Sequence, residues 1–182
     1  MKIYTKRGDA GQTDLFGGAR VSKANPRVIA YGAVDAANSA LGFVAASGDI
    51  FEPLSVELPK IMSDLFDLGA ELATVPKKAD KTAFLSVERV THLEQLIDQS
   101  EAEVPELKNF VLPTGCDLAA RLHMARTAVR CAEQEVISLH DSGEQVRAEI
   151  IQYLNRLSDL CFSWARWANI KSGTKEVLWV KN

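Results

Sequence analysis

The stretch Asn25 to Ser47, "NPRVIAYGAVDAANSALGFVAAS", indicates the fold class of this chain. Asn25 is a favoured N-cap residue, and Pro26 suits the first position of a helix. Apolar side chains then recur at helical spacing, at Tyr31, Val34, Leu41 and Val44 or Ala45. We therefore predict an amphipathic helix from about Pro26 to Ala46.

Four more helical patterns follow along the chain. They are a leucine-rich pattern from Leu58 to Leu72, then Val87 to about Ala102, Asp117 to about Leu139, and Glu144 to about Lys171. Residues 75–84 lack periodicity and are predicted to form a loop, as is "VPELKNFVLPTGC", whereas "KEVLWVKN" predicts a strand-like tail. Five amphipathic helices without alternating strands predict an all-α five-helix bundle in a single domain, 1–182, with the bundle at 25–172 and a tail at 173–182.

The composition indicates an ordinary soluble protein. Of 182 residues, 47% are hydrophobic and 25% are charged, with a net charge of −3, so no general attraction for nucleic acid is expected. The chain shows no secretory signal pattern, and no apolar run approaches the ~18 residues needed to cross a bilayer. We predict a cytoplasmic protein with no membrane partner, and we interpret its three cysteines as reduced thiols.

No metal site made of protein ligands alone is expected. Ferritin-like di-iron bundles require a Glu three residues before a ligating His, and none of His92, His123 and His140 has one.

Four polar residues of the fourth predicted helix fall within ~80° of one another, beside its apolar stripe: His123, Arg126, Arg130 and Glu133. One interpretation is a solvated face on which Arg130 pairs with Glu133 at i,i+3. The other is two guanidinium groups at an interface, where they bind a phosphate or carboxylate. The spacing alone leaves both open.

The first predicted helix carries a similar polar strip of small residues: Gly32, Asp35, Asn38 and Gly42. It indicates either close helix packing with Asp35 in solvent, or an Asp that orients an Arg of another helix.

The opening stretch Tyr4 to Thr13, "YTKRGDAGQT", is rich in glycine and basic residues. Gly8, Gly11, Gly17 and Gly18 allow backbone N–H groups to turn towards an anion, and Lys6, Arg7, Arg20 and Lys23 add positive charge. The stretch matches neither a Walker A loop nor a G-x-G-x-x-G fingerprint. A frayed terminus or a tight turn remains the alternative.

Five motifs, taken in order, resemble the PduO-type ATP:corrinoid adenosyltransferases: "KIYTKRGDAGQT", "VDAANSALG", "FVLPTG", "RLHMARTAVRCAE" and "YLNRLSDLCFSWAR". They cover nearly the whole chain. The resemblance implies a five-helix bundle that assembles as a homotrimer, with ATP and corrinoid bound at subunit interfaces.

The implied reaction transfers the 5′-deoxyadenosyl group of ATP to the Co(I) centre of a corrinoid, giving adenosylcobalamin or its precursor and triphosphate. The resemblance makes residues 1–24 an ATP-binding loop, with Thr5, Lys6, Gly8, Asp9, Gly11, Gln12, Thr13 and Lys23 at the nucleotide, and adds Arg130, Glu133 and Asn155 to that site. It implies that Asp35 pairs with Arg126 across a subunit boundary and that Phe110 helps to remove the lower ligand of the corrinoid. Arg130, Arg126, Asp35 and Phe110 are thus the expected catalytic group, and Glu133 is the expected contact of an ATP-bound Mg²⁺.

The chain departs from the usual family pattern at Arg7, Ala10, Ala36, Thr114 and Gln134, which bears on ATP affinity and corrinoid preference. The expected partners are ATP, a reduced corrinoid, a reductase and a B12-dependent enzyme. The alternatives are a non-catalytic helical trimer that binds a corrinoid or nucleotide, and a plain helical oligomerisation domain.

Overall fold

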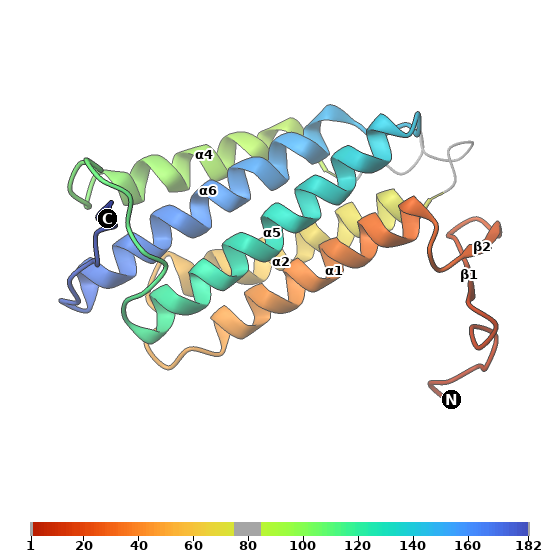
Figure 1. The fold of residues 1–182 in the computed structure, drawn as a ribbon, viewed down its shortest axis with the longest axis horizontal. Helices are drawn as coiled ribbons and strands as arrows, with labels where there is room; N and C mark the ends of the chain where they lie inside the picture. Colours follow the sequence, from red (N-terminus) through yellow and green to blue (C-terminus); the bar gives the residue numbers. More distant parts are fainter. Residues whose placement is uncertain (1, 75–84, 182) are drawn as a thin grey trace.

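The computed structural model describes residues 2–74 and 85–181, in which five helices form an elongated bundle (Figure 1). Their bounds are α1 Pro26–Ala45, α2 Leu54–Ala73, α4 Val87–Glu101, α5 Asp117–Asp141 and α6 Ala148–Lys171. The predicted all-α five-helix bundle is confirmed. The loop predicted at residues 75–84 lies outside the described residues.

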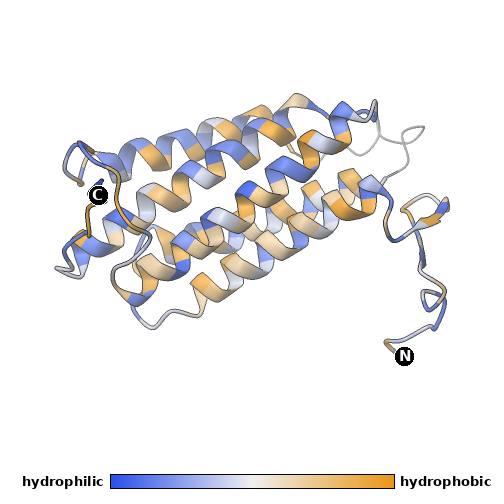
Figure 2. Ribbon diagram, in the orientation of Figure 1, coloured by the Kyte–Doolittle hydropathy of each residue, from blue (hydrophilic) through white to orange (hydrophobic). Residues whose placement is uncertain are grey.

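Helix α5 lies at the centre of the packing. It packs against both α1 and α6, while α2 flanks α1 and α4 flanks α6. Figure 2 shows polar and apolar residues banded along the helices, as expected where one face of each helix enters a shared core. The largest side chains of that core come from α6, where Tyr153 and Trp164 are fully buried.

Helix α6 begins later than the periodicity predicted. The pattern started at Glu144, but Arg147 is extended, with φ −71° and ψ 142°, and the helix starts at Ala148. Glu144 accepts a 2.6 Å bond from Arg27, and Arg147 donates to Glu71 at 2.6 Å. These contacts with other parts of the chain hold the four residues outside the helix.

Residues 12–22 form a short hairpin that the sequence did not predict. Strands β1 (Gln12–Asp14) and β2 (Arg20–Ser22) pair antiparallel, with Thr13 opposite Val21. Figure 1 shows this hairpin beyond the end of the bundle at which α1 begins. The predicted strand-like tail forms only an isolated bridge, between Val111 and Leu178.

Helix α1 corrects the prediction that no segment could cross a bilayer. It has 20 residues and a mean hydropathy of 1.4, which is enough to span a membrane by length and composition. A single such helix is weak evidence, because the core helix of a soluble protein passes the same test. Here α1 packs against α2 and α5.

Candidate functional site

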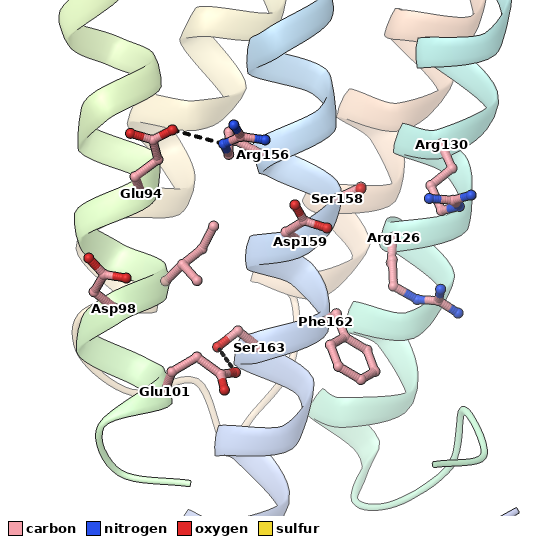
Figure 3. A pocket seen from close by; sticks show the side chains of 11 residues that line it. Glu94, Asp98, Glu101, Arg126, Arg130, Arg156, Ser158, Asp159, Phe162 and Ser163 are labelled. Atoms are coloured by element: carbon pink, nitrogen blue, oxygen red, sulfur yellow. Dashed lines mark hydrogen bonds and ion pairs between the residues drawn. The ribbon is translucent and has the colours of Figure 1, made fainter. Parts of the chain in front are cut away.

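A groove of about 500 Å³ runs between α4, α5 and α6 (Figure 3). Carboxylates of α4 form one wall and arginines of α5 form the other, with α6 as the floor between them. The charged residues that line it are Glu94, Asp98, Glu101, Arg126, Arg130, Arg156 and Asp159. The groove therefore presents separate basic and acidic walls.

The two α5 arginines that line the groove, Arg126 and Arg130, are available for an external anion. Arg130 is exposed and forms no ion pair with any described residue. The Nε of Arg126 is buried without a hydrogen-bond partner among the described residues, and its guanidinium carbon lies 6.0 Å from the ring centre of Phe162. Unpaired guanidinium groups at the wall of a groove suit phosphate or carboxylate groups.

Glu133 bonds across to α6 and not to Arg130. Asn155 donates to the Oε1 of Glu133 at 2.9 Å, and Arg156 donates to Asn155 at 2.8 Å and to Glu94 at 2.8 Å. The interpretation that Arg130 pairs with Glu133 at i,i+3 is therefore wrong. Glu133 and Asn155, predicted from separate motifs, do meet.

Asp35 and Arg126 do not meet within one chain. Asp35 is exposed and lines a different cleft, of about 350 Å³, between α1 and α2. Asn38 of the same cleft is buried, and it donates to the backbone oxygen of Met62 at 3.1 Å. The expected pairing of Asp35 with Arg126 would require a second copy of the chain.

Lys23, which follows the hairpin, packs back against the opening stretch. The backbone N–H of Lys23 donates to the oxygen of Gly11 at 2.9 Å, and a Cβ added at Gly8 would meet the Lys23 Nζ at 3.1 Å. Gly11 has φ +73°, a conformation that glycine adopts without strain. The stretch is thus a turned loop with Lys23 packed on Gly8, not an extended tail.

Phe110 lies far from the opening stretch. Its side chain is 76% exposed and meets Trp179 edge to face, with ring centres 6.3 Å apart. Figure 1 places the loop between α4 and α5, and the C-terminus, at the end of the bundle opposite the hairpin. A helix of 25 residues such as α5 is about 37 Å long. The predicted site residues are therefore spread along the bundle, and one chain does not gather them into one pocket.

A family model described as cobalamin adenosyltransferase matches residues 3–168. The chain belongs to the cobalamin adenosyltransferase family.

Known members of the family match this chain over most of its length. A corrinoid adenosyltransferase of Bacillus subtilis is 47% identical over 97% of this chain and 91% of its own. The corrinoid adenosyltransferase PduO of Salmonella typhimurium is 44% identical over 91% of this chain, which spans 49% of that protein. One similar solved structure is a PduO-type ATP:corrinoid adenosyltransferase from Lactobacillus reuteri, a phenylalanine-to-alanine variant complexed with cobalamin and ATP. It superimposes on this chain with a TM-score of 0.93 at 38% identity, and the match covers 99% of this chain and 100% of that one.

The sequence analysis did not predict some of the residues that line the groove. Arg156, Asp159 and Phe162 come from the "YLNRLSDLCF" motif, where Asp159 and Phe162 follow Asn155 by one and two helical turns and so share its face. That spacing could have revealed them. The α4 carboxylates carry no such signal, because acidic residues on one helix face are common in solvent.

Two buried titratable residues near the groove, His123 and Cys161, are electrically neutral at pH 7. Burial, together with the charge of Arg126, lowers the pKa of His123 below its usual value. Burial raises the pKa of the Cys161 thiol to about 12, so it is no nucleophile. Cys131, by contrast, is exposed.

The described residues contain no group of three or more His, Cys, Asp or Glu side chains that could hold a metal ion. Glu133 uses one carboxylate oxygen for Asn155, and the other accepts no hydrogen bond from any residue that the structure describes. This fits Mg²⁺, which proteins commonly bind through one or two carboxylates together with substrate phosphates.

Proposed function

We propose that this chain transfers the 5′-deoxyadenosyl group of ATP to the Co(I) centre of a corrinoid, with release of triphosphate. The observation that carries this proposal is the family match over residues 3–168. It is supported by the 0.93 TM-score to a relative complexed with both cobalamin and ATP.

The reaction requires positioning and charge stabilisation rather than a protein nucleophile. Co(I) donates its electron pair to C5′ of the ribose, the Co–C bond forms, and the C5′–O bond breaks with its electrons passing to triphosphate. Negative charge therefore grows on the leaving group. Lys6, Lys23 and Arg130 supply the positive charge that stabilises it. Holding C5′ in line with cobalt can contribute up to ~7–11 kcal/mol.

Each site is completed by two copies of the chain. Within one copy, the opening stretch lies at one end of the bundle and the loop that carries Phe110 lies at the other, while Asp35 and Arg126 line separate clefts. We assign residues 1–24 to the ATP-binding loop, with Thr5, Lys6, Gly8, Asp9, Gly11, Gln12, Thr13 and Lys23 at the nucleotide. Arg130, Glu133 and Asn155 face it from α5 and α6. A homotrimer with three such interfaces is the assembly proposed.

Mg²⁺ would be held by Glu133 and the triphosphate oxygens, where it supplies further positive charge. The hydrogen bond from Asn155 fixes the Glu133 carboxylate for this role.

Phe110 is proposed to act on the corrinoid and not on ATP. An exposed aromatic ring with Trp179 at its edge offers an apolar surface that excludes water and the lower axial ligand. Removing that ligand makes cobalt four-coordinate, which eases its reduction to Co(I).

An anaerobic assay tests the function. ATP, Mg²⁺ and chemically reduced cobalamin are mixed with the protein, and the Co–C bond is followed by its visible spectrum while triphosphate is measured. Formation of adenosylcobalamin and triphosphate in equal amounts is the expected result. Binding of both ligands without triphosphate would instead support the non-catalytic alternative.

Asp35→Asn should weaken corrinoid use. The substitution removes the charge proposed to orient Arg126 of a neighbouring copy, so the KM for corrinoid should rise about three- to tenfold while the KM for ATP changes less than twofold. Asp67→Asn is the matched control, because Asp67 is an exposed residue of α2 outside the α1–α2 cleft. Sedimentation shows whether the trimer persists; if the variant instead falls apart into monomers, the pair serves assembly and not corrinoid binding.

We place the protein in the cytoplasm. There it would work with a reductase that supplies the electron and with a B12-dependent enzyme that uses the product.

A further inference from the structure

We propose that Arg166 is a positioning residue for Phe110. Its guanidinium group holds the C-terminal tail, residues 173–181, against the Phe110 loop, residues 102–116. The inference rests on the proposed function, because it explains how the Phe110 ring is kept where the corrinoid reaction needs it.

Arg166 joins three segments from inside the protein. It lies on α6 with 2% of its surface exposed. Its Nε donates to Glu176 of the tail at 3.0 Å, and its Nη2 donates to the backbone oxygen of Pro105 in the loop at 2.8 Å. The carboxylate of Glu101, at the end of α4, lies 3.7 Å from its Nη1. The planar fork of arginine presents its N–H donors to the loop and to the tail in a fixed geometry, which the compact ammonium group of lysine does not reproduce.

The tail in turn holds Phe110 by its backbone. The N–H of Trp179 donates to the oxygen of Phe110 at 2.7 Å, and the N–H of Leu112 donates to the oxygen of Val177 at 2.8 Å. These bonds flank the antiparallel bridge between Val111 and Leu178. Glu176 directly precedes this paired segment, so its ion pair with Arg166 fixes the point at which the tail meets the loop.

The ends of the Phe110 loop are anchored independently of the tail. Glu103 accepts from Trp167 at 3.1 Å and from Lys171 at 2.6 Å, and the N–H of Cys116 donates to Asn169 at 3.0 Å. Gly115 is packed so closely that an added Cβ would lie 2.0 Å from the Asn169 Oδ1. Releasing the tail should therefore loosen the middle of the loop, where Phe110 lies, without moving its ends or unfolding the bundle.

Hydrogen exchange of Glu176→Ala tests the Arg166 clamp directly, that is, the ion pair between Arg166 and Glu176 that holds the tail against the Phe110 loop. The amides of Leu112 and Trp179 should exchange about tenfold faster or more, because each donates one of the loop–tail bonds, while amides in the middle of α5 keep their rates. Lys175→Ala is the matched control: it removes an exposed charge from the adjacent residue and should leave both amides unchanged. Unchanged exchange in Glu176→Ala would overturn the clamp.

The kinetic test asks whether the clamp acts through Phe110. Glu176→Ala should lower kcat about three- to tenfold with the KM for ATP within twofold of wild type. In a Phe110→Ala background the same substitution should cause no further fall, because the ring that it positions is gone. An equal fold-loss in both backgrounds would overturn the positioning role. Arg166→Lys, which keeps the buried charge but not the fork, should show the same non-additivity.

The two measurements separate this inference from the proposed function. A wild-type protein that makes no adenosylcobalamin would overturn the function and the catalytic half of the inference. The exchange rates of Leu112 and Trp179 would still decide whether Arg166 and Glu176 hold the tail.

Discussion

Arg130→Ala should lower kcat about 30- to 1000-fold, since removing one preorganised donor to a developing negative charge costs about 2–4 kcal/mol. The side chain is exposed at the wall of the groove and has no ion-pair partner among the described residues, so its charge is available to triphosphate. The bundle should stay intact, because Arg130 contributes no side chain to the hydrophobic core. Single-turnover kinetics with saturating ATP and reduced cobalamin measure the loss.

Two comparisons make the Arg130 result specific. Arg130→Lys should recover part of the rate, because it restores the charge but not the two-pronged geometry. Lys108→Ala removes a cation that is 78% exposed on the Phe110 loop and should leave the rate within twofold. Near-wild-type turnover of Arg130→Ala would exclude Arg130 from the site.

The fold could be predicted from the sequence because helical periodicity is a local signal. Pro26 and the apolar repeats after it gave the bounds of α1 almost to the residue. The signal was misleading where tertiary contacts compete with it. Residues 144–147 continue the helical pattern but are held in loop conformation by Arg27 and Glu71, whose side chains come from α1 and α2.

The site was harder to predict because its parts lie far apart. Glu133 and Asn155 could be matched from two motifs, and the structure brings them within 2.9 Å. The pairing proposed for Asp35, with Arg126 of another copy, could not be read from spacing in one chain, because no local pattern encodes a contact with another copy. The contacts of Arg166 could not be predicted either, because its partners Glu176 and Pro105 belong to segments without periodicity.

Phe110→Ala should lower turnover about ten- to a hundredfold while ATP binding stays within twofold of wild type. Phe110 is 76% exposed, and its loop, between α4 and α5, lies at the end of the bundle opposite the opening stretch that is proposed to bind ATP. Its loss should admit water or the lower ligand to the cobalt, which makes reduction to Co(I) harder. Anaerobic turnover gives the first quantity, and calorimetric titration with ATP and Mg²⁺ gives the second.

The spectrum of enzyme-bound Co(II) corrinoid identifies the step that Phe110 serves. Wild type should show a four-coordinate fraction that Phe110→Ala lacks, whereas Leu112→Ala, an apolar truncation 38% exposed in the same loop, should retain it. If Phe110→Ala lowers turnover and ATP binding equally, its ring belongs to the nucleotide site. If Leu112→Ala matches Phe110→Ala in both spectrum and rate, the loop acts through its general apolar surface and not through this ring.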